Sequence, residues 1–168
     1  MNGWYYFRAT DKAGNVSDEY KVCYDTGTPS VTLYSGTTSV SSGYYSNADY
    51  VKFTASDGVS GISSVYVKLP GNSYYSTYTN GSQLTAEGTY TFYAKDKSNN
   101  TSAYYTITLD KTKPTGILYA GTNTVKSGTY TNASYIKFVP SDGVSGLSAT
   151  YVKKPGSSSY VAYTSGTQ

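Results

Sequence analysis

GWYYFRATDKAGNVS, residues 3–17, returns as GTYTFYAKDKSNNTS, residues 88–102. The same shift of 85 positions turns NADYVKFTASDGVSGISSVYVKLPG (47–71) into NASYIKFVPSDGVSGLSATYVKKPG (132–156), and roughly half of the aligned positions are identical. Self-similarity at a fixed spacing is typical of repeated domains. The repeat therefore predicts small units of about 85 residues, each with its own core, instead of one large domain.

The phase of the repeat predicts where each unit begins and ends. YDTGTP (24–29) and LDKTKP (109–114) occupy equivalent positions, and each follows a strand-like run and ends in proline. Proline donates no backbone hydrogen bond and restricts the residue before it, so both stretches are expected to be links. Residues 26–110 then form one complete repeat. Residues 1–25 are the last strands of a preceding repeat, residues 111–168 are the first part of a following one, and the whole is expected to be a section of a longer array.

The composition and the local patterns favour an all-β fold. Tyrosine, threonine, serine and glycine dominate the chain, and tyrosine and threonine suit a pleated, half-buried surface. In the complete repeat, short alternating runs are separated by turn residues, and no stretch has a helical period. About seven short strands with turns every 8 to 12 residues predict an immunoglobulin-like β-sandwich in each repeat. The strand ranges expected from the alternation are 31–35, 50–55, 62–69, 74–79, 89–95 and 103–109.

The alternation also predicts the core and one turn. Phe53, Val67, Phe92 and Ile107 fall on the inward faces of four strands. The last two strands are expected to form a closing hairpin around a D-K-x-x-N turn. Gly14 in the first copy becomes Asn99 in the second, a replacement that predicts left-handed backbone at this position.

These residues resemble the tandem bacterial immunoglobulin-like (Big-type) repeats of extracellular surface proteins. The resemblance lies in an aromatic strand, the D-K-x-x-N turn at 11–15 and 96–100, a closing strand, and the D-x-x-x-P link at 25–29 and 110–114. The SDGVSG turn at 56–61 is similar to the turn before the third strand of such repeats. The resemblance implies an immunoglobulin-like fold and a location at the bacterial cell surface. It implies no particular activity, because a fold does not determine function.

Several classes of function are disfavoured by the sequence. The chain contains no histidine, no phosphate-binding glycine loop and no obvious carboxylate pair, so no enzymatic activity is expected. Its net charge of +3 comes from scattered lysines and arginines, which argues against a nucleic-acid partner. No apolar run is long enough to insert into a membrane as a helix.

Calcium is the one cofactor that the sequence suggests. Aspartates recur in turns or at the links, where carboxylate and backbone oxygens can converge on a hard cation. The alternative is that these aspartates accept hydrogen bonds from their own turns. The candidate metal ligands are Asp57, Asp96 and Asp110, and their counterparts Asp142, Asp11 and Asp25.

The many tyrosines suggest a surface for sugars. The chain has 22 of them, several in or near expected loops, where aromatic rings can form a platform for the face of a glycan. The alternative is that tyrosines pair across strands and keep their hydroxyls in water. The recurring candidates are Tyr45, Tyr75 and Tyr78, with their counterparts Tyr130, Tyr160 and Tyr163.

The function expected from the sequence is structural. Stacked repeats joined by short links would form a stalk or spacer of a bacterial cell-surface protein, an adhesin for example. Asp110 and Pro114 are the residues expected to be structurally important at the link. The expected partners are neighbouring repeats of the same protein and a host or glycan ligand. The alternative is a glycan-binding or accessory module of a secreted carbohydrate-active enzyme. Residues 111–168 lack the last two strands of a repeat, and residues 1–25 are those two strands. Head-to-tail self-assembly, in which 1–25 of one molecule completes 111–168 of another, is therefore expected.

Overall fold

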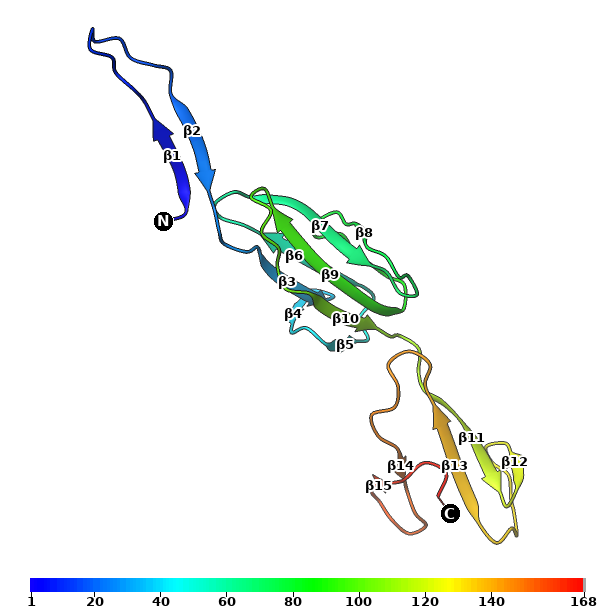
Figure 1. The fold of residues 1–168 in the computed structure, drawn as a ribbon. Helices are drawn as coiled ribbons and strands as arrows, with labels where there is room; N and C mark the ends of the chain where they lie inside the picture. Colours follow the sequence, from blue (N-terminus) through cyan, green and yellow to red (C-terminus); the bar gives the residue numbers. More distant parts are fainter. Residues whose placement is uncertain (168) are drawn as a thin grey trace. The chain divides into compact units, whose positions relative to one another are not determined.

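The computed structural model describes residues 1–167 and contains strands without any helix in that range, which confirms the all-β expectation (Figure 1). No described segment is therefore a helix capable of crossing a membrane. The chain divides into two compact units, Met1–Lys111 and Thr112–Gln168, and the division falls inside the second predicted link.

The first unit begins with a two-stranded antiparallel hairpin of β1 (Gly3–Phe7) and β2 (Tyr20–Tyr24). The turn at its tip contains Gly14 with a φ of 91°, and Asn99 in the equivalent turn has a φ of 68°, so the predicted left-handed backbone is confirmed. The large apolar side chains of the hairpin are exposed on both faces.

The rest of the first unit contains two sheets that enclose one core (Figure 1). A three-stranded sheet has the order β4–β3–β6, and a five-stranded sheet has the order β5–β10–β9–β7–β8. All pairings are antiparallel except that of β5 with β10. The strands are β3 (Ser30–Ser35), β4 (Thr38–Val40), β5 (Tyr44–Ser46), β6 (Val51–Ser56), β7 (Ile62–Lys68), β8 (Ser76–Thr77), β9 (Gly88–Asp96) and β10 (Tyr105–Leu109).

The core lies where the two sheets face each other. Phe53 of β6 stacks on Phe92 of β9 with ring centroids 5.0 Å apart. All four core residues expected from the alternation, these two with Val67 and Ile107, are buried. Strand alternation was sufficient to find them because each strand has one face on the core and the other toward solvent.

The strand ranges differ from expectation in two places. β4 and β5 were not expected, because they are only three residues long and lie in a segment rich in serine and glycine. The Tyr-rich run expected at 74–79 contributes only the two residues of β8. Short edge strands carry too few residues to show an alternation of their own.

The second unit repeats the first part of this arrangement. β11 (Thr115–Ala120) pairs with β12 (Asn123–Val125) and with β13 (Ile136–Ser141), and β14 (Tyr151–Val152) pairs with β15 (Val161–Ala162). Strands equivalent to β9 and β10 do not occur in its described residues. Ala120 is its one buried hydrophobic residue among those described.

Candidate functional site

Three aspartates of the first unit converge at the end of the sheets where β9 finishes. Asp25, Asp57 and Asp96 each offer a carboxylate oxygen, and these oxygens all lie within 4.8 Å of one another. Asp57 and Asp96 were expected from the sequence as metal ligands of this repeat. Their third neighbour is the link aspartate that precedes the repeat, Asp25, and not the one that follows it, Asp110.

Asp57 is fixed by the SDGVSG turn. Its Oδ1 atom accepts hydrogen bonds from the backbone N–H groups of Val59, Ser60 and Gly61, at 3.1, 2.9 and 2.9 Å. These bonds, that of Gly61 foremost, hold the pKa of Asp57 below its ordinary value. Hydrogen bonds donated to a carboxylate stabilise its charged form, so Asp57 is ionised at neutral pH.

Asp96 closes the D-K-x-x-N turn. Its Oδ1 accepts from the backbone N–H of Asn100 and its Oδ2 from the side-chain amide of the same residue, both at 2.8 Å. The Nδ2 atom of Asn100 also donates to the backbone carbonyl of Asp25 at 3.0 Å. Asn100 therefore ties the closing hairpin to the link, a role for which its only sequence signal is recurrence of the same asparagine as Asn15.

Asp25 binds the link to the rest of the first unit. Its Oδ1 accepts from Nδ2 of Asn2 at 3.1 Å and from N–H of Gly27 at 2.9 Å. Its Oδ2 accepts from N–H of Ser60 at 3.1 Å. The side chain is buried, and so a single carboxylate joins the hairpin, the link and the SDGVSG turn.

This cluster can serve two purposes. Carboxylate oxygens gathered this closely are ligands that Ca²⁺ prefers, and a divalent cation would offset the repulsion between the three negative groups. The same oxygens already accept hydrogen bonds that organise the two turns and the link. The geometry is therefore compatible with both interpretations of the sequence, a metal site and a set of aspartates that accept hydrogen bonds from their own turns.

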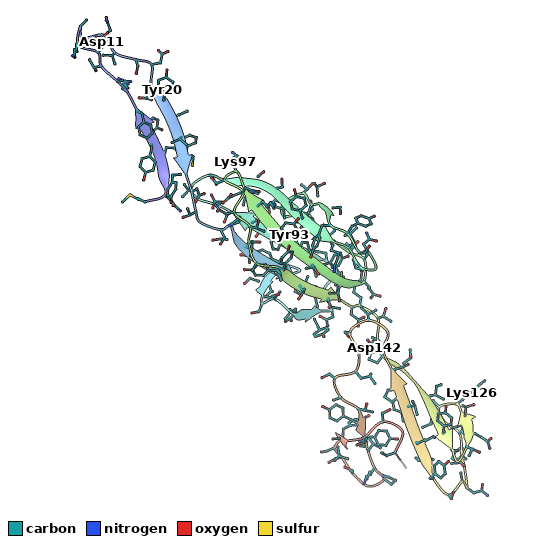
Figure 2. The ribbon with its side chains drawn as sticks, viewed as in Figure 1. Asp11, Tyr20, Tyr93, Lys97, Lys126 and Asp142 are labelled. Atoms are coloured by element: carbon teal, nitrogen blue, oxygen red, sulfur yellow. The ribbon has the colours of Figure 1, made fainter. Side chains whose placement is uncertain are left out.

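The other three candidate aspartates lie apart from this cluster. Asp110 is buried next to β5, where its N–H donates to the carbonyl of Ser46 at 2.8 Å. Asp11 lies in the turn of the first hairpin and Asp142 in the SDGVSG-type turn of the second unit, both labelled in Figure 2. Asp142 accepts from N–H of Gly146 at 2.7 Å, as Asp57 does from Gly61.

A second candidate surface is a cluster of four tyrosines on the outer face of the five-stranded sheet. Tyr66 of β7 and Tyr93 of β9 are paired in register, and their rings stack with centroids 4.8 Å apart. Tyr75 and Tyr104 flank Tyr93 at 5.0 and 5.1 Å. Tyr93 is labelled in Figure 2. We call Tyr66, Tyr75, Tyr93 and Tyr104 the tyrosine face.

The tyrosine face is amphipathic. Partial burial is the main cause that raises the pKa of Tyr93, and its neighbour Tyr66 raises it further. Burial likewise raises the pKa of Tyr75, and the neighbouring Tyr104 raises it further. The phenols of Tyr75 and Tyr93 therefore stay neutral at physiological pH, and the tyrosine face presents aromatic carbon together with hydroxyl groups.

The predicted glycan platform is not assembled as one surface. Of its members only Tyr75 belongs to the tyrosine face. Tyr78 is buried in the core, where its hydroxyl accepts from N–H of Phe53 at 3.2 Å and donates to the carbonyl of Ser82. Tyr45 is exposed on the edge strand β5.

The counterparts in the second unit behave similarly. The Tyr163 hydroxyl accepts from N–H of Phe138 at 2.9 Å, as Tyr78 does from Phe53, while Tyr130 and Tyr160 are exposed. Sequence reasoning missed Tyr66, Tyr93 and Tyr104. The signal that could have found them was the strand alternation itself, which places Tyr66 and Tyr93 opposite the core.

The chain has no match among protein-family models, curated proteins or solved structures.

Proposed function

We propose that the chain is a non-catalytic stalk or spacer segment of a bacterial cell-surface protein, built from tandem immunoglobulin-like repeats. The observation that carries the proposal is the hydrogen-bonded link at Asp25. Both carboxylate oxygens and the backbone carbonyl of this residue accept hydrogen bonds. A spacer transmits position only if its links resist bending, and a buried, multiply bonded link residue supplies that resistance.

Two features of the sequence support the surface setting. The D-K-x-x-N turn and the D-x-x-x-P link resemble those of bacterial immunoglobulin-like surface repeats. The packing of a three-stranded against a five-stranded sheet in residues 30–110 is compatible with that resemblance. The repetition itself favours a role in length or spacing, since repeated units extend an array without changing its local structure.

Stiffness of the link is the property to measure. Spin labels at Lys12→Cys in the hairpin turn and Ser73→Cys in the complete repeat, in a Cys23→Ser background, should give one narrow distance distribution. Asp25→Ala should broaden it, because three donors, on Asn2, Gly27 and Ser60, lose the carboxylate that accepts their hydrogen bonds. Asp49→Ala, an exposed aspartate of the same repeat, is the matched control. A broad distribution in the parent protein, or no response to Asp25→Ala, would contradict the proposal.

The spacer role can be tested on cells. The chain is inserted between a bacterial surface anchor and an epitope, and binding of a large antibody to the epitope is measured. A stiff spacer should give more binding than a Gly/Ser linker of equal residue number, because a flexible chain has a shorter mean end-to-end distance. Equal binding by the two would argue against a spacer.

The tyrosine face favours a second candidate function, glycan binding by a module of a secreted carbohydrate-active enzyme. Four clustered rings next to Nζ of Lys68, which lies 6.0 Å from the Tyr75 ring centroid, offer both apolar surface and hydrogen-bond donors. Titration with polysaccharides should then change tyrosine fluorescence, and Tyr93→Ala should abolish the change. Tyr45→Ala, an exposed tyrosine outside the cluster, should not. Absence of binding to any glycan on an array, together with unchanged tyrosine fluorescence, would exclude this function.

A further inference from the structure

We propose that the tyrosine face is a site of oxidative cross-linking, at which hydrogen peroxide, acting through a peroxidase, joins Tyr66 of β7 to Tyr93 of β9 by a carbon–carbon bond. The product is a dityrosine within one chain. The proposal concerns a covalent modification and depends on neither of the two proposed functions. It rests on the register of the two strands, the ring contacts of the tyrosine face and the unequal exposure of its members.

Strand register holds the two reacting rings together. Tyr66 and Tyr93 are direct partners in the antiparallel pairing of β7 with β9, which lie side by side in Figure 1. Facing residues of such a pair have Cα atoms about 4.5–5.5 Å apart and side chains on the same face of the sheet. The neighbouring partners Val67 and Phe92 are buried in the core, so the strands cannot separate at this point without opening it.

The rings are also suitably oriented. Those of Tyr66 and Tyr93 stack with centroids 4.8 Å apart and planes 16° from parallel. Burial is the main cause that raises the pKa of Tyr93, and Tyr66 comes first among the neighbours that raise it further. Repulsion between phenolate charges falls with distance, so this order places the Tyr66 hydroxyl nearest to that of Tyr93. The ring carbons next to the hydroxyls, which are the ones that couple on oxidation, are brought together in the same way.

The other ring pairs are less well arranged for coupling. Tyr75 meets Tyr93 edge to face at 78°, so the edge of one ring faces the centre of the other. Tyr104 lies just before β10, outside its paired residues, and its ring is tilted by 55° to that of Tyr93. Among these contacts, only the stacked pair of Tyr66 and Tyr93 is also fixed by strand register.

Tyr104 gives an oxidant access to this pair. It is 60% exposed, whereas Tyr66 and Tyr93 are only partly exposed. Its ring centroid lies 5.1 Å from that of Tyr93. An electron removed from Tyr104 can therefore be replaced from Tyr93 and then from Tyr66 through ring contacts. Two radicals formed within one cluster meet without diffusing, which favours coupling within the chain over coupling between molecules.

The reaction balances with hydrogen peroxide as the oxidant. Each of the two phenols loses one electron and one proton and becomes a tyrosyl radical. The radicals join through the carbons next to their oxygens. Each of these carbons then loses its hydrogen as a proton while its oxygen gains one, which restores both phenols. The two electrons and two protons break the O–O bond of the peroxide and give two molecules of water, so the chain loses two hydrogen atoms.

The bond would connect two inner strands of the five-stranded sheet. It would close a loop of 27 residues between positions 66 and 93. A covalent loop restricts the unfolded chain, as a disulfide does, and so favours the folded state. The oxidised complete repeat should therefore unfold at a higher urea concentration than the reduced one.

Oxidation of the dilute full chain tests the proposal. Peroxidase and hydrogen peroxide are added in a Cys23→Ser background, because the one thiol of the chain is itself readily oxidised. The monomer should lose the mass of two hydrogen atoms and acquire the fluorescence of dityrosine. Absence of dityrosine from the monomer, or its formation only in dimers, would overturn the proposal.

Trypsin, which cuts after lysine, then locates the bond. Tyr66 is the only tyrosine of peptide 53–68, and Tyr93 lies in peptide 69–95. These two peptides should be recovered linked to each other. Recovery of peptide 69–95 linked to peptide 98–111, which contains Tyr104, would assign the bond to a different pair and contradict the proposal.

Two conservative variants complete the test. Tyr66→Phe keeps the stacked ring but has no phenol to oxidise, so the dityrosine yield of the monomer should fall several-fold and oxidation should no longer raise the urea midpoint. Tyr74→Phe is the matched control, since Tyr74 is 65% exposed, shares the tryptic peptide of Tyr93 and lies outside the tyrosine face. It should react like the parent. Equal yields from the two variants would overturn the proposal.

Discussion

The complete repeat and the second unit have nearly the same sequence pattern and the same β-registers, yet they bury their side chains very differently. Phe53 is fully buried, and its counterpart Phe138 is only partly so. The difference comes from β9 and β10, which cover the three-stranded sheet in one unit and are absent from the other among the residues described. Strand pairing within a sheet is thus set locally, whereas burial of its inner face depends on the partner sheet.

The β1–β2 hairpin leads to the same conclusion. Its outer face also differs from that of the complete repeat: Arg8 and Glu19 form an ion pair at 3.2 Å where Tyr93 and Tyr104 pack ring against ring. Both pairs connect the two arms of their hairpin just beyond the paired strand residues. The inward face is retained between the hairpin and the β9–β10 pair while the outer face differs, so the hairpin has no counterpart of Tyr93 and Tyr104.

The largest difference in stability between the complete repeat and the hairpin is expected when phenylalanine is replaced by alanine at equivalent positions of the two. Phe92→Ala removes a fully buried ring that stacks on Phe53, and it should lower the free energy of unfolding of the complete repeat by about 3–5 kcal/mol. Phe7→Ala should have almost no effect in dilute solution, where the hairpin is unpaired. Urea unfolding followed by circular dichroism measures both. Equal losses would mean that the hairpin is already covered.

A smaller effect is expected from the core tyrosine hydroxyl. Tyr78→Phe leaves the N–H of Phe53 and the carbonyl of Ser82 without their partner, which should cost about 1–3 kcal/mol. Tyr163→Phe removes the equivalent bonds to Phe138 and Thr167 from a more open site, and water can replace them there. Its loss should be the smaller one by the same urea measurement. The reverse order would contradict the difference in burial.

Two buried tyrosines, Tyr78 and Tyr90, predict a loss of stability at alkaline pH. Burial raises the pKa of Tyr78 and of Tyr90 above their ordinary value of 10.0. A raised pKa in the folded state gives stability that is complete below the unfolded value and is lost as the pH rises through the folded value. Urea midpoints of the complete repeat should therefore fall above about pH 10. Tyr78→Phe should reduce this fall, and an unchanged profile would be evidence against the assignment.

An acid limit is expected from the turn aspartates. Backbone donors, Gly61 foremost, lower the pKa of Asp57, and the Asn15 side chain does the same for Asp11. A lowered pKa gives stability that is present above the unfolded value, near 3.8, and is lost as the pH falls through the folded value. Asp57→Asn, which can still accept hydrogen bonds but cannot be protonated, should flatten the profile of the complete repeat below about pH 4. A profile as steep as that of the parent would place the acid sensitivity elsewhere.

Sequence reasoning located the inward faces and the D-K-x-x-N turn because strand alternation and left-handed backbone are local properties. Phe53 and Asn99 were predicted on these grounds. It gave both link aspartates, Asp25 and Asp110, as candidate ligands and did not decide which of them joins the cluster of the complete repeat, because the two are equivalent in the repeat. Which of the two meets Asp57 and Asp96 depends on the end of the sheets at which each lies, and this is a property of the three-dimensional arrangement. It also missed Asn100 as the connection between turn and link, since an asparagine in a turn has a sufficient local explanation.

The smallest expected effect is that of calcium, and it too distinguishes the two units. Asp25, Asp57 and Asp96 are assembled only in the complete repeat, while Asp142 lacks such neighbours among the described residues. We expect Ca²⁺ to raise the melting transition of the complete repeat over that in EDTA and to leave the second unit unchanged. At a Ca²⁺ concentration equal to Kd the gain is only about 0.4 kcal/mol, so a concentration series is needed. Asp57→Asn should remove the shift. If Ca²⁺ shifts neither transition, the carboxylates act only as hydrogen-bond acceptors for the two turns and the link.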